Sequence, residues 1–513
     1  MTAAGKQHKT ETPQGGTGAP AGLARQWQSI DWRKALREVR KLQRRIAKAV
    51  AEGHWNKVKV LQRLLTRSYW AKVLAVRKVT SNRGARTPGV DGIRWTTPAQ
   101  KMKGAYSLVK QGYRARPLRR VLIPKKPGSD KKRALGIPCI QDRAMQALHH
   151  MALEPIAETR ADPNSYGFRP YRSTWDAIGQ GFCVLGKKTS VGWVFEGDIR
   201  ACFDKISHAW MEEHIFMDRS LLRQWLKAGY IWEKQLFETT EGTPQGGIIS
   251  PTLCNVVLDG LERAVREAVP RDERVFFIRY ADDFVVAAEK REVLEGPVPK
   301  AVEQFLAPRG LQLSPEKTKL THIDEGFDFL GKHLQKQRGR LFITPTAKNV
   351  QSICAKIRQT VRDCFGRPAA DLIRRLNPII RGWATSHRTV QSGDAFSTVE
   401  QETFAAVWRW CQRNHPNKNR TWIFRRYYGT SIQGRWGRFH AWDKPRQRLV
   451  ELVRPQDVPL VRYIKVRAQS NPHDANDREY FMMRRQAKNY RPIKEQPLAS
   501  TAGRSTRAPQ LVK

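Results

Sequence analysis

The chain has 513 residues, enough for several domains, and it contains no run of about 18 apolar residues that would cross a membrane. It carries 93 Lys and Arg residues against 47 Asp and Glu residues, which gives a formal net charge of +46. A surface this basic attracts polyanions over long range, so nucleic acid is the leading partner. A membrane surface is the competing anion, and the absence of a long apolar run disfavours it.

The N-terminal part divides into a tail and a helical region. Residues 1–22 are rich in Gly, Pro, Thr and Ala and lack the apolar centre of a signal peptide, so we expect a disordered tail. In residues 23–80, apolar residues such as Leu36, Val39 and Ile46 recur at helical spacing. Lys and Arg fill the faces between them. We therefore expect a helical extension that binds RNA, with a solvated helix face as the alternative.

A basic hairpin is predicted next. The apolar runs "RRVLIPKK" and "RALGIPCI" flank the turn "PGSDKK", a pattern typical of two β-strands with a cationic tip. Lys125 and Arg133 lie at the ends of these runs. Long cations on such a tip can fold over a triphosphate and neutralise its charge, although an isolated charged turn is usually a solvated loop.

Two acidic strand ends stand out in this basic chain. The stretch "GWVFEGDIRACFDKI" predicts a strand that ends at Asp198, with Asp204 shortly after it. The stretch "RVFFIRYADDFVVAA" predicts two apolar strands around a turn that holds Asp282 and Asp283. Adjacent carboxylates repel each other, and removing them from water raises the cost of ionising them, so a purely structural turn explains them poorly.

A metal site explains these acids better. One strand-terminal Asp and an Asp pair on a neighbouring hairpin can hold two Mg²⁺ ions, which prefer hard oxygen ligands shared with substrate phosphates. Two such ions roughly 3.5–4 Å apart activate an attacking hydroxyl and stabilise a leaving pyrophosphate. Mn²⁺ is an alternative ion.

The segment "PQGG" places Gln245 on a loop beside Gly246 and Gly247. Glycines permit a close approach of the backbone to a base pair or a sugar. The Gln245 amide can hydrogen-bond an incoming nucleotide. A plain turn at the start of a helix is the alternative interpretation.

The remaining pattern gives a coarse domain division. Residues 81–345 are mixed α/β, and "FDFLGKHL" with "GRLFITP" predicts another hairpin. Residues 346–440 are expected to be helical. Residues 441–490 are basic and rich in Arg and Pro, and residues 491–513 are expected to fray into a disordered tail.

At this point the motifs resemble a known family. "YADD" with "DIRACFD" resembles the palm of a reverse transcriptase. Seven further stretches occur in the order of the reverse-transcriptase blocks of group II intron-encoded proteins: "TPGVDG", "IPKKPGSDKKRALGIPCIQDRAMQ", "LEPIAE", "SYGFRPYRS", "GTPQGGIISPTLCNVVL", "LSPEKTKLTHI" and "FDFLG". The resemblance covers residues 25 to 440, and it indicates a bacterial-type group II intron-encoded reverse transcriptase and maturase.

This resemblance implies an α/β multidomain fold, the right-hand polymerase with a helical N-terminal extension. Residues 81–345 would form the fingers and palm, 346–440 the helical thumb or maturase domain X, and 441–490 a basic DNA-binding region. The implied activity is RNA-directed DNA synthesis, in which dNTPs are added to a 3′-hydroxyl on an RNA template. The implied second activity is binding of the parent intron RNA to promote splicing and retromobility.

The resemblance also assigns roles to single residues near the acids. Asp198, Asp282 and Asp283 match the catalytic metal-binding triad, with the backbone carbonyl of Ile199 as a further ligand. Asp204 is expected to be mainly structural.

Five residues are implied in dNTP binding. Phe203 matches the position whose ring packs against the deoxyribose and excludes a 2′-hydroxyl. Gln245 would hydrogen-bond the nucleotide, while Lys125 and Arg133 would contact its triphosphate. Lys317 in "SPEKTKL" resembles the lysine near the pyrophosphate, where it can donate a proton.

The C-terminal half resembles the maturase-specific domain in "NPIIRGWATSH" and "FAAVWRWCQRNHPNKNRTWIFRRYY". Aromatic rings can stack on unpaired bases while cations hold phosphates. Most of these aromatic residues are expected in the core. The RNA-binding residues are therefore expected to be Arg413, Lys418, Arg425 and Arg426.

Partners and location follow from the resemblance and the composition. We expect the intron RNA, target DNA and dNTPs as partners and no membrane, and a homodimer stays open. The seven scattered cysteines form no CxxC pair, so we expect no disulfide framework and a bacterial cytoplasmic location. No cysteine follows Cys411 and no HNH-like histidine cluster is present, so we expect no HNH endonuclease. Priming would then need another route, for example a nascent DNA strand.

Two alternatives belong to other classes. One is a maturase that only promotes splicing and whose polymerase site is a relic, but the acids and "PQGG" are both intact. The other is a reverse transcriptase recruited by a host, for example in phage defence. The presence of domain X favours an intron origin without excluding later recruitment.

Overall fold

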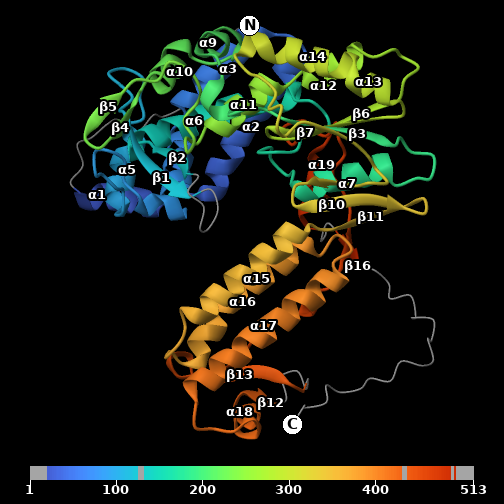
Figure 1. The fold of residues 1–513 in the computed structure, drawn as a ribbon. Helices are drawn as coiled ribbons and strands as arrows, with labels where there is room; N and C mark the ends of the chain where they lie inside the picture. Colours follow the sequence, from blue (N-terminus) through green and yellow to red (C-terminus); the bar gives the residue numbers. More distant parts are fainter. Residues whose placement is uncertain (1–19, 125–131, 430–435, 487–489, 493–513) are drawn as a thin grey trace, which may run out of the picture.

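The computed structural model describes residues 20–124, 132–429, 436–486 and 490–492. Figure 1 shows a broad body and a long arm that extends from it. The body contains the chain up to Pro345, the arm contains the helices that follow, and the chain then returns to the body. This two-part shape separates the candidate sites described below.

Four N-terminal helices form one layer of the body: α1 (Pro20–Gln28), α2 (Trp32–Ala51), α3 (Trp55–Arg67) and α4 (Tyr69–Thr80). α2 begins after Asp31, whose carboxylate accepts hydrogen bonds from two backbone amides of the first turn. Val39 and Ile46 are buried in the same core as α6 (Ile140–Arg160), as their spacing predicts. Leu36 departs from the expected pattern, because its side chain is 40% exposed.

The fingers contain a four-stranded sheet in the order β2-β1-β4-β5. Its strands are β1 (Leu118–Pro124), β2 (Lys132–Ile137), β4 (Tyr230–Trp232) and β5 (Gln235–Phe237). β1 and β2 pair antiparallel, which confirms the predicted basic hairpin. Arg133 lies in β2, whereas Lys125 lies outside the described residues. The helix α5 (Pro98–Tyr106) packs against α1 and α4.

The palm is a second four-stranded sheet, in the order β6-β7-β3-β8, with helices on both faces. Its strands are β3 (Trp193–Asp198), β6 (Val275–Tyr280), β7 (Asp283–Ala288) and β8 (Lys319–His322). Successive side chains of a strand point to opposite faces, and here they enter two cores. Phe195, Phe277 and Val286 enter one core, while Val194 and Ile278 enter the other.

Helices cover both faces of the palm sheet. The core that contains Phe195 is shared with α6, α11 (Ser250–Leu258), α12 (Leu261–Glu267) and α14 (Pro297–Leu306), and the core that contains Val194 is shared with α7 (Thr174–Leu185). Shorter helices connect these elements: η1 (Arg83–Arg86), α8 (Cys202–Lys205), α9 (His208–His214), α10 (Arg219–Leu226), α13 (Arg291–Glu295) and η2 (Ala307–Arg309).

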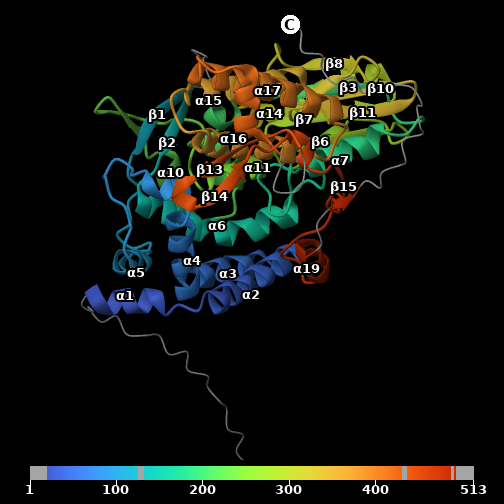
Figure 2. The same cartoon turned by 90° about the horizontal axis from the view of Figure 1, so that it is seen from below.

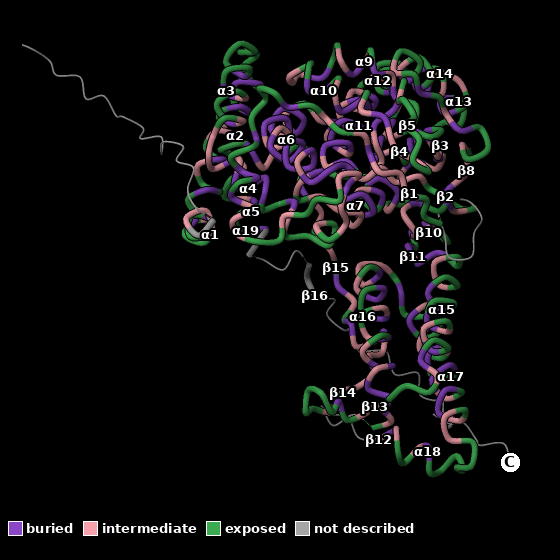
Figure 3. The backbone as a smooth tube through the Cα atoms, turned by 90° about the vertical axis from the view of Figure 1, so that its left-hand side faces the viewer, coloured by how far each residue is buried: buried purple, intermediate pink, exposed green. Residues whose placement is uncertain are grey.

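The arm begins after a three-stranded sheet of β9 (Phe327–Phe329), β10 (Lys332–Gln337) and β11 (Arg340–Pro345), which confirms the hairpin predicted from "FDFLGKHL" and "GRLFITP". Its helices are α15 (Ala347–Arg362), α16 (Ala369–His387), α17 (Gly393–Asn414) and α18 (Arg420–Tyr427). Figure 3 shows that α15, α16 and α17 alternate buried and exposed stretches, as expected for a bundle with one shared core.

The arm core continues past the predicted thumb limit at residue 440. A small sheet of β12 (Tyr428–Gly429), β13 (Arg438–Asp443) and β14 (Arg448–Glu451) closes the arm, and η3 (Lys444–Arg446) and η4 (Pro455–Asp457) lie beside it. Phe439, Leu452 and Val458 pack into the same core as the helices. The thumb unit therefore includes residues that their basic composition had assigned to the next segment.

The C-terminal segment, residues 461–486, packs on the body rather than forming a separate unit. It contains β15 (Val461–Tyr463) and α19 (Arg478–Gln486), and β15 pairs with β16 (Tyr490–Pro492). Val466 and Phe481 enter the core of α7, and Figure 2 shows α19 beside the N-terminal helix layer. The predicted region 441–490 is therefore divided between the arm and the body. In the part of the chain that the structure describes, no helix has the length and apolar character needed to cross a membrane.

Candidate active site

The three predicted acids meet at one edge of the palm sheet. Asp198 ends β3 and lies opposite Asp283, the first residue of β7, in the antiparallel register. Asp282 occupies the turn between β6 and β7. The surrounding protein atoms and the charges of Asp282 and Asp198 raise the pKa of Asp283 to about 6, although its side chain reaches the solvent. Burial and the charge of Asp198 also raise the pKa of Asp282.

Two cations face this acidic cluster. Lys317 Nζ donates a hydrogen bond to Asp198 Oδ1 at 2.9 Å, and this contact raises the pKa of Lys317. The charge of Arg133 lowers the pKa of Asp282, opposing the effect of burial, so the basic hairpin reaches the site from the fingers. Ile199 pairs with Leu313 in an isolated bridge directly after β3.

The carboxylate oxygens of Asp198, Asp282 and Asp283 suit a hard cation, although the three side chains do not enclose a metal position. Within the described ranges, no group of three or more His, Cys, Asp or Glu side chains is drawn close enough to hold a metal ion. The carboxylates of Asp282 and Asp283 resist ionisation chiefly because they are removed from water, and the negative charge of Asp198 adds to this effect. The ammonium group on Asp198 already supplies positive charge to the cluster. These oxygen ligands therefore fit a divalent cation such as Mg²⁺.

The predicted nucleotide residues lie beside the acids. Phe203 in α8 is partly buried, and its ring contacts Phe168 edge-on at a centroid distance of 6.2 Å. Gln245 Nε2 lies 3.3 Å from Asp204 Oδ1, so Asp204 holds the glutamine side chain, in line with its expected structural role. The Gln245 carbonyl accepts a hydrogen bond from the Gly136 amide of β2 at 2.8 Å. The "PQGG" loop thus joins palm and fingers.

One glycine of this loop is required by the packing. Gly246 has a φ of +120°, and a Cβ atom placed on it would lie 2.6 Å from the carbonyl oxygen of Gly136. A larger residue would push the loop away from β2. This close approach explains why the turn beside Gln245 needs glycine.

Comparison with known proteins identifies the family. The family model for reverse transcriptase (RNA-dependent DNA polymerase) matches residues 123–334. The N-terminal domain of reverse transcriptase matches residues 27–108, and the group II intron maturase-specific domain matches residues 350–428. Protein YkfC of Escherichia coli (strain K12) is 33% identical over 357 residues, which cover 59% of this chain and 90% of that protein. The chain belongs to the group II intron-encoded reverse transcriptase family.

Other relatives are longer than the matched segment. The group II intron-encoded protein LtrA of Lactococcus lactis subsp. cremoris is 28% identical over 332 residues, 52% of this chain and 55% of that protein. An uncharacterized 91 kDa protein in the cob intron of Schizosaccharomyces pombe is 28% identical over 411 residues, 64% of this chain and 50% of that protein. The chain thus spans about half the length of these two relatives. Reverse transcriptases are RNA-directed DNA polymerases that depend on divalent metal ions.

The thumb of the reverse transcriptase carries the four predicted RNA-binding cations. They lie at or near α18, at the end of the arm away from the palm sheet (Figure 1). All four side chains are exposed: Arg413, Lys418, Arg425 and Arg426. Lys418 Nζ lies 5.5 Å from the ring centre of Trp422, which is itself exposed. The structure therefore separates these residues from the acids.

Most of the interleaved aromatic residues are wholly or partly buried, as expected. Trp383 and Trp410 are buried in the thumb core, whereas Trp422 remains exposed. Two neighbouring histidines of α6, His149 and His150, are half-buried, and burial lowers the pKa of each to about 4. Neutral imidazoles of this kind are poor partners for RNA phosphates.

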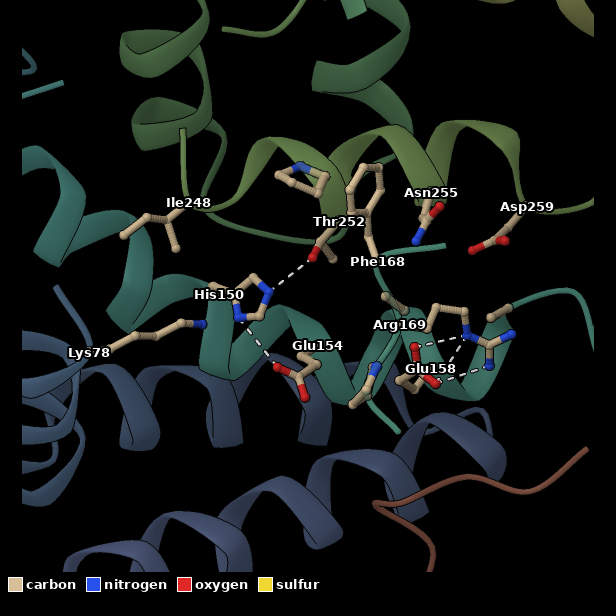
Figure 4. Close-up of a pocket in the computed structure, with 14 residues that line it drawn as sticks. Lys78, His150, Glu154, Glu158, Phe168, Arg169, Ile248, Thr252, Asn255 and Asp259 are labelled. Atoms are coloured by element: carbon tan, nitrogen blue, oxygen red, sulfur yellow. Dashed lines mark hydrogen bonds and ion pairs between the residues drawn. The ribbon is translucent and has the colours of Figure 1, made fainter. Parts of the chain in front are cut away.

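A cavity of about 310 Å³ lies between α6 and α11 in the reverse transcriptase (Figure 4). His150 Nε2 lies 2.9 Å from Thr252 Oγ1 across it, and Arg169 forms a buried ion pair with Glu158. Asn255 points into the same cavity from α11. The polar wall therefore belongs to a network that links α6, α11 and the loop before α7.

Sequence reasoning missed one buried residue beside the acids. Arg279 of β6 has a fully buried side chain and lies three positions before Asp282. The sequence did contain a signal for this residue, because Arg279 interrupts the otherwise apolar run "VFFIRY". Its partners, Asn255 and Asp259, come from a distant helix and its end, so the local pattern could not reveal them.

Proposed function

We propose that this chain copies RNA into DNA at the edge of the palm sheet and binds its parent group II intron RNA to promote splicing and retromobility. The observation that carries the first part is the register of Asp198 opposite Asp283, with Asp282 in the adjoining turn. This register gathers three carboxylates at the point where the fingers and the "PQGG" loop also meet. The partners are the intron RNA, target DNA and dNTPs.

Asp198 and Asp282 would be the main ligands of two Mg²⁺ ions, with Asp283 and the Ile199 carbonyl completing the set. When bound, the ions would activate the primer 3′-hydroxyl and stabilise the leaving pyrophosphate. These carboxylates supply the negative charge that the metal ions need, in a protein that is otherwise strongly basic. The excess positive charge outside the site holds the nucleic acids.

The neighbouring residues would bind and select the nucleotide. Arg133 and Lys317 neutralise charge on the triphosphate, and the Lys317 ammonium group can protonate the departing pyrophosphate. The Phe203 ring blocks the space that a 2′-hydroxyl would occupy. The Gln245 amide hydrogen-bonds the incoming nucleotide. Lys125 stays a prediction from the sequence.

The test of the polymerase proposal is primer extension on an RNA template with the Asp282→Ala/Asp283→Ala double variant. We expect cDNA synthesis to fall below detection while intron splicing continues. The wild-type protein and the exposed Glu325→Ala variant serve as controls. Survival of cDNA synthesis in the double variant would exclude this metal site. If wild-type protein supports splicing but makes no cDNA, the chain is a splicing-only maturase.

The maturase part is supported by exposed cations beside exposed aromatic rings on the arm. Arg425 and Arg426 lie in the last turn of α18, where both can reach RNA phosphates. Replacing both with Ala should weaken intron RNA binding most strongly at low salt and make its salt dependence shallower, because two phosphate contacts that release counterions are lost. Unchanged splicing across a salt titration would remove both residues from the interface. These complexes would act in the bacterial cytoplasm.

A further inference from the structure

Arg279 carries a buried charge next to the turn that holds Asp282. Its side chain is 0% exposed, and its Nη2 atom lies 2.5 Å from Asp259 Oδ1 and 3.8 Å from Asp162 Oδ2. Removing a guanidinium group from water is costly unless carboxylates and hydrogen bonds compensate it. Here two acids do so, and burial raises the pKa of Asp259 to about 7 even beside this arginine.

The same guanidinium group also contacts the turn itself. Arg279 Nη1 donates to the carbonyl oxygen of Ala281 at 3.3 Å. Ala281 has a φ of +59°, the left-handed region that a residue with a Cβ atom adopts only when its surroundings hold it there. Because Ala281 immediately precedes Asp282, its backbone angle sets the direction of the following carboxylate.

A second segment also approaches this turn closely. A Cβ atom placed on Gly167 would lie 2.3 Å from the amide nitrogen of Ala281. Asn255 Nδ2 donates to the Gly167 carbonyl at 2.8 Å, and Asn255 Oδ1 accepts from Arg279 Nη1 at 3.3 Å. Arg279, Asn255, Gly167 and Ala281 therefore form a closed ring of contacts. We define these four residues as the turn clamp.

The backbone closes the turn clamp further. The Tyr166 amide donates to the Arg279 carbonyl at 2.8 Å, and the Arg279 amide donates to the Asn164 carbonyl at 2.9 Å. Phe168, which follows the clamp glycine, contacts the Phe203 ring. A shift of this loop would therefore reach both the carboxylate turn and the nucleotide side of the site.

We propose that Arg279 is a positioning residue for reverse transcription, and that the turn clamp fixes the turn that presents Asp282 and Asp283. This inference rests on the proposed role of those two aspartates. A guanidinium group suits the task because its planar fork reaches Asp259, Asn255 and Ala281 at once. A lysine keeps the charge but cannot make all three contacts.

Arg169 is a second buried arginine in the same region, and its contacts are those of a purely structural residue. It is 7% exposed and pairs with Glu158, and it donates to the carbonyls of Asp162 and Ser165. None of its hydrogen bonds in the described residues goes to the turn between β6 and β7. Arg279 differs because it both balances buried charge and holds the backbone next to a candidate metal ligand.

The experiment compares Arg279→Lys with wild type in the full chain. Primer extension on poly(rA)/oligo(dT) would give kcat, KM for dTTP and the Mg²⁺ concentration for half-maximal rate. Electron paramagnetic resonance of Mn²⁺ without substrate would report metal affinity independently of activity. We expect kcat to fall by about 100-fold, as for a 1 Å misplacement. We expect metal affinity to fall by about 10-fold, as when a residue that orients a metal ligand is changed. KM for dTTP should change much less.

Two further variants keep the test decisive. Gly167→Ala leaves the Arg279 charge pairs intact and pushes on Ala281 directly, so it should give the same loss if Arg279→Lys does not fold. Arg438→Lys is the matched control, because Arg438 is a buried arginine paired with Asp457 in the thumb. It should lower the melting temperature without changing Mn²⁺ affinity.

Each outcome decides between the explanations. Wild-type kcat and Mn²⁺ affinity in folded Arg279→Lys and Gly167→Ala would overturn the inference. An equal loss of Mn²⁺ affinity in Arg438→Lys would also overturn it, because general destabilisation would then explain the effect. If wild-type protein neither makes cDNA nor binds Mn²⁺, both the proposed function and the inference that rests on it are wrong. A wild-type enzyme with unaffected clamp variants refutes the inference alone.

Discussion

Lys317 Nζ lies 2.9 Å from Asp198 Oδ1 at the edge of the palm sheet. The two residues come from the loop before β8 and from the end of β3, which pair in the sheet only up to Glu196 and Lys319. The lysine therefore reaches the carboxylate across the open edge, where a triphosphate would approach. Before the substrate binds, the Lys317 ammonium group can balance the negative charge of Asp198. Afterwards it can balance the charge of the triphosphate.

Replacing Lys317 with Ala should reduce the rate of nucleotide addition by about 10²–10⁴-fold if the lysine donates a proton to pyrophosphate. The measurement is single-turnover primer extension with saturating Mg²⁺. Lys319→Ala is a matched control, since that exposed lysine lies two residues away and faces Glu196. Similar rates for both variants and wild type would remove Lys317 from the chemistry.

Replacing Phe203 with Val should admit ribonucleotides. The smaller side chain opens the space beside the sugar, and removing such a steric contact changes discrimination by about 10–200-fold. The measurement is the ratio of kcat/KM for dTTP and UTP on the same primer and template. The value for dTTP should stay within about threefold of wild type. An unchanged ratio would place the sugar elsewhere.

The junction of palm and thumb should depend on pH. Lys332 Nζ lies 2.5 Å from His387 Nδ1 in a buried contact between β10 and α16. Burial lowers the pKa of Lys332 to about 7, and burial with the nearby lysine lowers that of His387 to about 3. Both folded-state values lie below the unfolded values, so the folded protein binds fewer protons. Stability should therefore rise with pH from about 3 to 6.5 through the histidine. It should rise again from about 7 to 10.4 through the lysine.

Thermal unfolding of wild type and Lys332→Met between pH 6 and 10 measures this effect. The lysine contributes a slope of at most about 1.4 kcal/mol per pH unit above pH 7. The Met variant should lose that slope. Equal slopes in the two proteins would show that Lys332 titrates normally in the folded state.

Releasing the C-terminal segment should destabilise the palm. The carboxylate of Asp176 is fully buried and accepts hydrogen bonds from the Val466 amide at 2.6 Å and from Arg484 Nη2 at 3.1 Å. Arg484→Met leaves this acid without its charged partner, at a cost of about 3–5 kcal/mol. Hydrogen exchange should then increase across residues 461–486. Arg478→Ala, an exposed change on the same helix, should leave exchange unaltered.

The sequence predicted the arrangement of the acids because the relevant signals are local. A strand ending at Asp198 and a hairpin around Asp282 and Asp283 follow from apolar runs and turns, and both are confirmed. The resemblance to the reverse-transcriptase blocks predicted the neighbouring "PQGG" loop. The basic hairpin could be placed in the same way, because its two strands are adjacent in the chain.

Other parts could not be predicted, because their signals lie far apart in the sequence. The charge of Arg279 is compensated by Asp259 and Asp162, which precede it by 20 or more positions. The basic composition of residues 441–490 indicated one DNA-binding region, and its DNA binding stays a prediction. A few apolar residues, among them Val466 and Phe481, pack part of this region on the palm, and no local pattern revealed that contact.

The most direct test of the central claim is to map the metal site in the wild-type protein bound to primer and RNA template. Fe²⁺ with ascorbate and peroxide generates radicals that cleave the backbone next to the bound ion. Cuts should appear close to residues 198–204 and 280–284 and should disappear with excess Mg²⁺ or with Asp282→Ala/Asp283→Ala. Cuts that avoid both stretches, or that persist in the double variant, would contradict the account.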